Sequence, residues 1–391
     1  MHKEYGPIVR ISPYELHVID PAFFEKLYRQ DGSWDKYAWA LDGFSAGGAI
    51  ICTADHDVHK ARRLPLNSFF SKARVANKQG LIRHNVQKFC DRIWQFSETK
   101  KIVNIGAATS AFTRDVSTEF ILGKTYNSLD KEDFDIGMTN VFQDSGHEST
   151  QDTQDLLAAV ASSDTNDKTP RTIVHEIVDS SLPAKDKKFE RVFDDVATVT
   201  GAGFETTASV LRLIIFHVFN NPEILRRLRE ELSSASIPPS DLVEVKALEQ
   251  LPYLTSILME GMRLSPAIAS RSARIATDRD LTYGKWCIPA GTPVGMTTLL
   301  MHTNEKLYPN PMQFNPDRWM DLDARRKYDK TYAPFSRGTR ICLGMNLAWA
   351  KCTCFLLLLL NDLIFGLREL PQRTLNVRVI SSSLGLVERA F

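Results

Sequence analysis

The spacing of apolar and polar positions predicts a mainly helical protein with a small β region. Apolar and polar residues alternate over residues 8–11 and 15–19, and Ser12-Pro13 lies between the two runs. This pattern predicts a β-hairpin near the start of the chain. Helical spacing then recurs and predicts helices over residues 21–29, 59–68, 76–97, 107–122 and 171–179.

The second half of the chain continues this helical pattern. We expect one long helix over residues 187–220, ended by Pro222, and further helices over 222–233, 252–264 and from just after Cys342. Short apolar runs predict strands over 274–276, 281–283 and 292–294. The chain has no internal repeat and no low-complexity linker. Residues 1–391 are therefore predicted to form a single domain.

Composition excludes several classes of protein. The 48 Lys and Arg residues nearly balance the 47 Asp and Glu residues, so the charge gives no reason to expect a nucleic-acid partner. Six scattered cysteines do not make a disulfide framework and indicate a reducing compartment. The first residues lack the apolar core of a signal peptide or anchor. The apolar run 355–365 is short and contains Asp362, which favours a buried core helix.

The strongest chemical signal is the string Phe335-Ser-Arg-Gly-Thr-Arg-Ile-Cys-Leu-Gly344. A loop that leads into a helix offers free N–H groups and a helix dipole, which stabilise a thiolate at Cys342. Gly344 allows the backbone to approach a flat ligand, Arg340 can reach an anionic group, and Phe335 can cover the sulfur. An isolated cysteine at such a place would more often be a buried structural residue.

This string resembles the haem-binding signature of the cytochrome P-450 family, Phe-x-x-Gly-x-Arg-x-Cys-x-Gly, at every fixed position. The resemblance implies the mainly α cytochrome P-450 fold. It also implies haem b as the cofactor and Cys342 as the axial ligand of its iron. Further phrases, at residues 55–59 and 288–296, are similar to filamentous-fungal members of the trichodiene-oxygenase-like group, which hydroxylate secondary metabolites.

Two other segments resemble the family in its order along the chain. Glu260-Gly-Met-Arg263 is similar to the Glu-x-x-Arg of the K helix, and Arg318 lies in a segment like the family's Pro-x-Arg-Phe/Trp. The resemblance implies that Glu260, Arg263 and Arg318 form a buried structural triad that braces the cysteine loop. Buried charges are tolerated only when they satisfy one another.

The string Ala202-Gly203-Phe204-Glu205-Thr206-Thr207 resembles the family's I-helix motif. Small residues at 202 and 203 leave room for a ligand, and an acid followed by an alcohol can relay protons. Ala202 and Gly203 are thus expected to contact the cofactor, and Glu205 and Thr206 to be catalytic. Without the resemblance, the same residues would as readily form a polar patch on a helix surface.

Haem carries two propionates, which need cationic partners. His59 and Arg63 lie one helical turn apart where the family's C helix provides such partners, and Arg274 and Arg340 occupy two further family positions. We expect these four residues to bind the cofactor. The alternative for His59 and Arg63 is an exposed basic helix.

The chain departs from the family at three places. The family's N-terminal anchor and hinge are absent. Residues 124–190 are a shortened and poorly defined F–G region, with an apparent join near His147-Glu148. The tail after Cys354 no longer resembles the family. The chain is therefore predicted to be truncated, with an open roof over the substrate that favours uncoupled turnover.

The resemblance implies a monooxygenase that uses O2, an apolar small-molecule substrate such as a terpenoid or polyketide, and electrons from an NADPH-cytochrome reductase. The family's location is the cytosolic face of the endoplasmic reticulum, whereas a chain without an anchor would be cytoplasmic. Two alternatives remain open. One is a haem-thiolate isomerase or dehydratase that needs no reductase, which the Glu205-Thr206 pair disfavours. The other is a truncated product that binds haem but has no activity.

Overall fold

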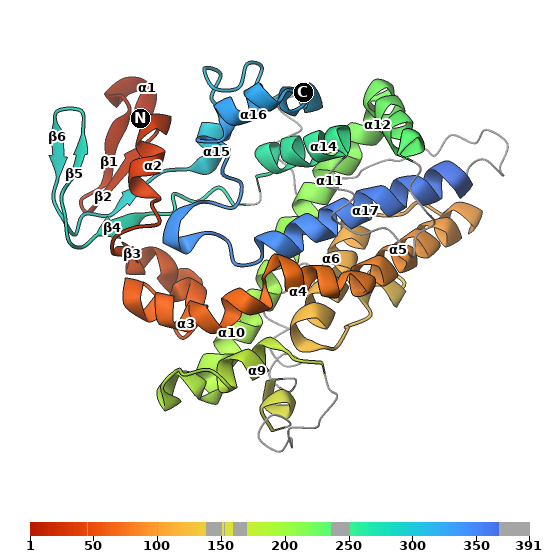
Figure 1. Cartoon of the computed structure of the whole chain (residues 1–391), viewed down its shortest axis with the longest axis horizontal. Helices are drawn as coiled ribbons and strands as arrows, with labels where there is room; N and C mark the ends of the chain where they lie inside the picture. The colour runs from red at the N-terminus through yellow and green to blue at the C-terminus, as the bar shows by residue number, and fades with distance from the viewer. Residues whose placement is uncertain are drawn as a thin grey trace.

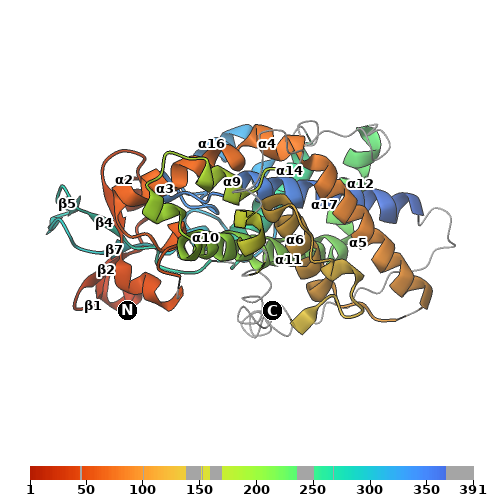
Figure 2. The ribbon, with the colours of Figure 1, turned by 90° about the horizontal axis from the view of Figure 1, so that it is seen from below.

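The computed structural model describes residues 1–44, 46–99, 101–137, 151, 153–158, 170–235, 251–266 and 268–366. A body of helices makes up most of the described structure, and a small β region lies at one end of it (Figure 1). The same arrangement is visible from below (Figure 2). The predicted mainly α class with a small β region is therefore confirmed.

The β region joins segments from the two halves of the chain. Its five-stranded sheet has the order β1-β2-β7-β4-β3, in which β2 and β7 are parallel and the other neighbours antiparallel. The strands are β1 (Ile8–Ser12), β2 (Glu15–Val18), β3 (Trp34–Lys36), β4 (Arg274–Ala276) and β7 (Val294–Gly295). A separate hairpin pairs β5 (Leu281–Tyr283) with β6 (Trp286–Ile288). The predicted N-terminal hairpin and the strands over 274–276 and 281–283 are confirmed, whereas β3 and β6 were not predicted.

The helices pack mainly around α17, which lies between α5 and α11 (Figure 1). Its residues Lys351 to Leu360 are all buried, so the predicted core helix is confirmed. The ring of Phe355 contacts those of Phe89 and Phe112 at centroid distances of 4.8 and 5.0 Å. The helices are α1 (His2–Tyr5), α2 (Phe24–Leu27), α3 (His56–Phe69), α4 (Lys72–Asn77), α5 (Gln79–Thr99), α6 (Ile105–Leu122), α9 (Ile173–Val178), α10 (Phe189–Ala202), α11 (Glu205–Asn220), α12 (Pro222–Ser234), α14 (Pro252–Leu264), α15 (Thr298–His302), α16 (Leu322–Tyr328) and α17 (Met345–Gly366).

The helix expected over residues 187–220 is instead two helices, α10 and α11. Phe204 has φ −83° and ψ −88°, outside the helical region, and separates them. Hydroxyl and ammonium groups of nearby side chains bind the carbonyls of Ala202 and Gly203 at this point. Side chains that bind backbone carbonyls compete with the helical hydrogen bonds and are a known cause of helix breaks.

Two shorter predictions also differ from the structure. The helix expected over 76–97 begins as α4 and continues as α5 after Lys78. Residues 21–29 form a short 3-10 helix, η1 (Pro21–Phe23), followed by α2. Among the described residues, one stretch, Phe189–Asn220, is long and apolar enough to cross a membrane; a single such stretch is weak evidence for a span.

Candidate active site

The loop that carries Cys342 lies between α16 and α17 and contains the 3-10 helix η7 (Gly338–Arg340). Gly338 has φ +75°, and a Cβ there would lie 2.4 Å from the carbonyl oxygen of Arg29. The loop therefore needs glycine at this position. The N–H of Cys342 donates to the carbonyl of Phe335 at 3.0 Å and closes the loop.

The Cys342 thiol is open to solvent although protein surrounds it closely enough to alter its chemistry. Burial raises the pKa of the thiol, while a hydrogen bond from the Gly344 N–H and the charge of Arg63 lower it. An added Cβ at Gly344 would meet no atom within 4 Å. The chain at Gly344 thus has room for a flat group to approach it, and the two donors offset part of the rise in pKa that burial causes.

Four predicted cationic residues and one that was not predicted gather near this loop. Burial, followed by the charges of Arg340, Arg63 and Lys36, lowers the pKa of His59 to about 2. Burial, followed by the charges of Arg274 and Arg340, lowers the pKa of Lys36 to about 7. Burial and neighbouring positive charge therefore both disfavour the protonated forms of His59 and Lys36. We call this set the cation cluster: Lys36, His59, Arg63, Arg274 and Arg340.

Backbone carbonyls, rather than carboxylates, bind most of the cation cluster. Arg63 donates to Ile341 O at 2.6 Å, Lys36 to Ile51 O at 2.6 Å, and Arg340 to Thr53 O at 2.7 Å. The Nε atom of Arg340 is buried without a hydrogen-bond partner. Within the described ranges, no member of the cluster forms an ion pair with a carboxylate.

Buried cations normally have anionic partners. The cluster therefore fits a ligand that brings negative charge, and Cys342 fits a ligand that brings a metal ion. The two propionates and the iron of haem satisfy both conditions. This match rests on the unpaired Nε of Arg340, the open space at Gly344 and the thiol itself.

The α10–α11 break carries the second predicted group of site residues. Thr206 Oγ1 donates to Ala202 O across the break at 2.7 Å. The carboxylate of Glu205 accepts a hydrogen bond from Arg212 at 2.9 Å, and its Oε1 is buried without a partner. Sequence reasoning missed Arg212, although its position seven residues after Glu205 places both residues on one helix face.

The predicted triad is present, with Glu260 and Arg263 fully buried and Arg318 partly buried beside them. Glu260 accepts from Arg263 at 2.7 and 2.8 Å and from Arg318 at 3.3 Å. Arg263 also donates to His302 O at 2.7 Å, and the His302 ring accepts the N–H of Ala333 at 3.0 Å. The triad is thereby connected to the chain just before Phe335, as a bracing role requires.

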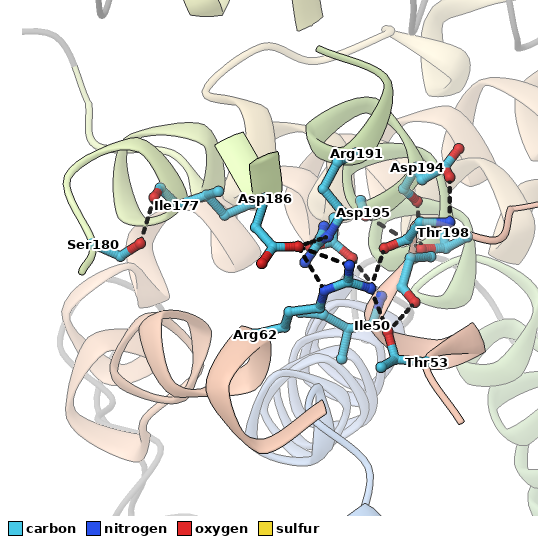
Figure 3. A network of polar contacts seen from close by, with 12 residues as sticks. Ile50, Thr53, Arg62, Ile177, Ser180, Asp186, Arg191, Asp194, Asp195 and Thr198 are labelled. Atoms are coloured by element: carbon cyan, nitrogen blue, oxygen red, sulfur yellow. Dashed lines mark hydrogen bonds and ion pairs between the residues drawn. The ribbon is translucent and has the colours of Figure 1, made fainter. Parts of the chain in front are cut away.

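A further polar network, which sequence reasoning missed, fixes the segment before α3 (Figure 3). Arg62 donates to Asp186 at 2.7 Å and to the Thr53 hydroxyl at 2.9 Å. Arg191 pairs with Asp195, whose carboxylate also accepts the N–H of Ile50 at 2.7 Å.

This network is connected to the cation cluster through Thr53, because the Thr53 carbonyl accepts from Arg340. Basic and acidic residues such as Arg62 and Asp195 are common on helix surfaces, so the sequence alone gave no reason to single them out. Their burial is visible only in the structure, where Asp195 is fully buried.

Comparison with known proteins gives one family. The cytochrome P-450 family model matches residues 1–163 and 147–378, in two segments that overlap. A cytochrome P-450 monooxygenase of Ascocoryne sarcoides is 34% identical over 89% of this chain and 77% of its own length. The N-acetyltryptophan 6-hydroxylase of Emericella nidulans is 33% identical over 90% of this chain and 77% of its own. The monooxygenase TRI4 of Fusarium sporotrichioides is 33% identical over 90% of this chain and 75% of its own length.

These matches confirm the resemblance to fungal secondary-metabolite members, including the trichodiene-oxygenase-like group. They also correct one expectation. The family match continues to residue 378, so the similarity does not end at Cys354. Of the shortened region expected over 124–190, residues 138–150, 152 and 159–169 lie outside the described residues, as does the tail after 366.

Proposed function

The chain belongs to the cytochrome P-450 family, and on that premise we propose that it inserts one oxygen atom from O2 into an apolar small molecule. Cytochrome P-450 monooxygenases of fungal secondary metabolism are its relatives, so oxygen insertion is the reaction type. The finer proposal is a terpenoid or polyketide substrate, with electrons from a separate NADPH reductase. Residues 1–391 act as one domain, and contact with that reductase favours the cytosolic face of the endoplasmic reticulum.

One observation carries the proposal: an accessible thiol at Cys342 lies next to the cation cluster, which lacks carboxylate partners among the described residues. Cys342 would hold the iron of haem b. Arg340, Arg63, His59, Arg274 and Lys36 would hold its propionates. Bound there, the haem would supply the activation of O2.

The residues of the chain then prepare the site. Burial raises the pKa of Cys342, and the Gly344 N–H and the Arg63 guanidinium offset part of that rise, so they would assist formation of the thiolate when haem binds. With haem bound, Phe335 would help to keep water from the sulfur. The triad of Glu260, Arg263 and Arg318 keeps the loop in place.

The expected space for a ligand is not found at Gly203, where a Cβ would lie 2.5 Å from Ser117 Oγ, so glycine instead lets the helix break pack against α6. The hydroxyl proton of Thr206 is directed to Ala202 O in this structure, so Thr206 must turn to donate elsewhere. The Glu205 carboxylate, held by Arg212, would take up protons and pass them toward that hydroxyl.

The test is the carbon monoxide difference spectrum of the reduced holoprotein, with Cys342→Ser beside it. We expect a red-shifted Soret band that the substitution removes. A matched control is Cys287→Ser, which changes another exposed thiol, distant from Cys342 in sequence, and should leave the band unchanged. Folded protein with no haem band would contradict the proposal and favour an inactive product.

Substrates are sought with a panel of terpenoids and polyketides, with N-acetyltryptophan included because a relative hydroxylates it. Product formation must require both NADPH and reductase. Turnover without either would instead support the haem-thiolate isomerase or dehydratase.

A further inference from the structure

A buried lysine on α17 contacts the helix break. Lys351 is 1% exposed, and its Nζ donates to Gly203 O at 3.0 Å, to Ser117 Oγ at 2.5 Å and to Thr113 O at 3.3 Å. All three partners are neutral oxygens. Two of them belong to α6 and the third to the break between α10 and α11.

An ammonium group in this place needs strong compensation, because burial removes its hydration. Burial lowers the pKa of Lys351 to about 7. Gly203 is the C-cap of α10, where the helix dipole places partial negative charge. The carbonyl of Gly203 is therefore a favourable acceptor for a buried cation.

The two carbonyls at the break are bound by different side chains. Thr206 on α11 donates to Ala202 O, whereas Ser117 and Lys351 donate to Gly203 O, Ser117 at 3.1 Å. The first backbone hydrogen bond of α11 runs from Ala208 N to Phe204 O, one residue beyond the break. The hydrogen bonds to the Gly203 carbonyl therefore come from α6 and α17.

We infer that Lys351 is a positioning residue that fixes the α10–α11 break and thereby the place of the Thr206 hydroxyl. Lys351 touches no reacting atom; it acts through Gly203 and Ser117. It also connects the break to the helix that begins just after Cys342. This inference deepens the proposed function and rests on it only where it concerns oxygen chemistry.

The experiment compares the holoprotein with Lys351→Met and Lys351→Gln. Methionine keeps the volume but offers no N–H, whereas glutamine keeps a donor on a shorter side chain. Lys78→Met is the control, because Lys78 is a half-buried lysine whose ammonium likewise binds a backbone carbonyl, Phe120 O, at 3.1 Å. It is the residue after α4, and its ammonium binds the last turn of α6 rather than the α10–α11 break.

Hydrogen–deuterium exchange of the segment 203–208 is the first readout. We expect about tenfold faster exchange in Lys351→Met, since one charge-assisted hydrogen bond is lost. Lys351→Gln should fall between Lys351→Met and the parent, and Lys78→Met should match the parent in this segment. The second readout is the peroxide released per NADPH consumed, measured with reductase present. It should rise from the parent to Lys351→Gln and further to Lys351→Met.

Unchanged exchange and unchanged peroxide yield in Lys351→Met would overturn the inference. If that variant does not fold, Lys351→Gln decides by the same two measurements. Failure of the proposed function is distinguishable, because it would appear as a missing carbon monoxide band in the parent. Exchange at 203–208 would still show whether Lys351 holds the break.

Discussion

Arg212 Nη2 lies 2.9 Å from Glu205 Oε2, so the acid of the I-helix motif is paired within its own helix. The same guanidinium donates to the Ser110 hydroxyl on α6 at 3.0 Å. Arg212 therefore fixes the direction of the Glu205 carboxylate. An acid that must deliver protons has to be held within reach of its acceptor, and an arginine partner can hold its carboxylate in place.

Replacement of Glu205 tests its role. In Glu205→Gln the amide keeps the shape but cannot carry a proton, so we expect product formation to fall about a hundredfold. Peroxide released per NADPH consumed should rise, because oxygen is reduced without transfer to substrate. Both are measured with reductase and a substrate identified by product analysis.

The control for this substitution is Glu223→Gln on α12, an exposed acid that also pairs with an arginine, Arg226. It should behave as the parent. Arg212→Gln keeps the acid and loses only its orientation, so its defect should be smaller than that of Glu205→Gln. A Glu205→Gln enzyme with parental coupling would show that the Glu205–Arg212 pair is only structural.

Most residues of the candidate site could be singled out from sequence motifs, whereas residues that lie next to them only in the folded structure could not. Cys342, the triad and the Glu205-Thr206 pair follow one another in a fixed order, and long gapped patterns of this kind are specific. Lys36 was missed because a single lysine in a three-residue strand carries no pattern. It joins the cation cluster through the pairing of β3 with β4, which places Lys36 opposite Arg274.

In the fold, regular helices could be predicted from the sequence, whereas the helix break at Gly203 could not. Long amphipathic helices such as α5 and α12 were predicted because their apolar residues repeat at helical spacing. The break at Gly203 was not predicted, because its cause lies in Ser117 and Lys351, far away in sequence. Contacts of this range are set by tertiary packing, which local periodicity does not record.

Removal of Arg63 should make Cys342 less reactive. Its charge lowers the pKa of the thiol, so Arg63→Met should raise that pKa and reduce the thiolate fraction. In haem-free protein near pH 8, alkylation of Cys342 should then be slower than in the parent. Peptide-resolved mass spectrometry measures the rate.

Cys287 provides an internal control in the same samples, since it is exposed and hydrogen-bonds to Asp280 rather than to Arg63. Its alkylation rate should not change. If Cys342 reacts as fast in Arg63→Met as in the parent, the guanidinium does not act on the thiol.

Glu260→Gln should destabilise the fold strongly. The Glu260 carboxylate and the Arg263 guanidinium are fully buried, and the carboxylate also accepts from Trp319 Nε1 at 2.8 Å. Loss of one partner of a buried ion pair costs about 3–5 kcal/mol because the other charge remains buried. Denaturant unfolding measures the change.

The control is Asp323→Asn, which removes one partner of an exposed pair with Arg326 and should cost less than about 1 kcal/mol. Equal effects of the two substitutions would contradict the bracing role.

The stability of the haem-free protein should depend on pH through Lys36. Burial, then the charges of Arg274 and Arg340, lowers its pKa from 10.5 to about 7. Between these values the unfolded chain binds a proton that the folded chain does not, so the free energy of unfolding rises with pH across this window. Lys36→Met should show a shallower rise, and the difference between the two curves isolates this residue from other groups that titrate there. Lys330→Met, which changes an exposed side chain, should follow the parent. Haem should flatten the difference, because a propionate beside Lys36 favours the charged ammonium in the folded state. A flat difference curve without haem would show that Lys36 keeps its proton on folding and that burial and its charged neighbours do not lower its pKa.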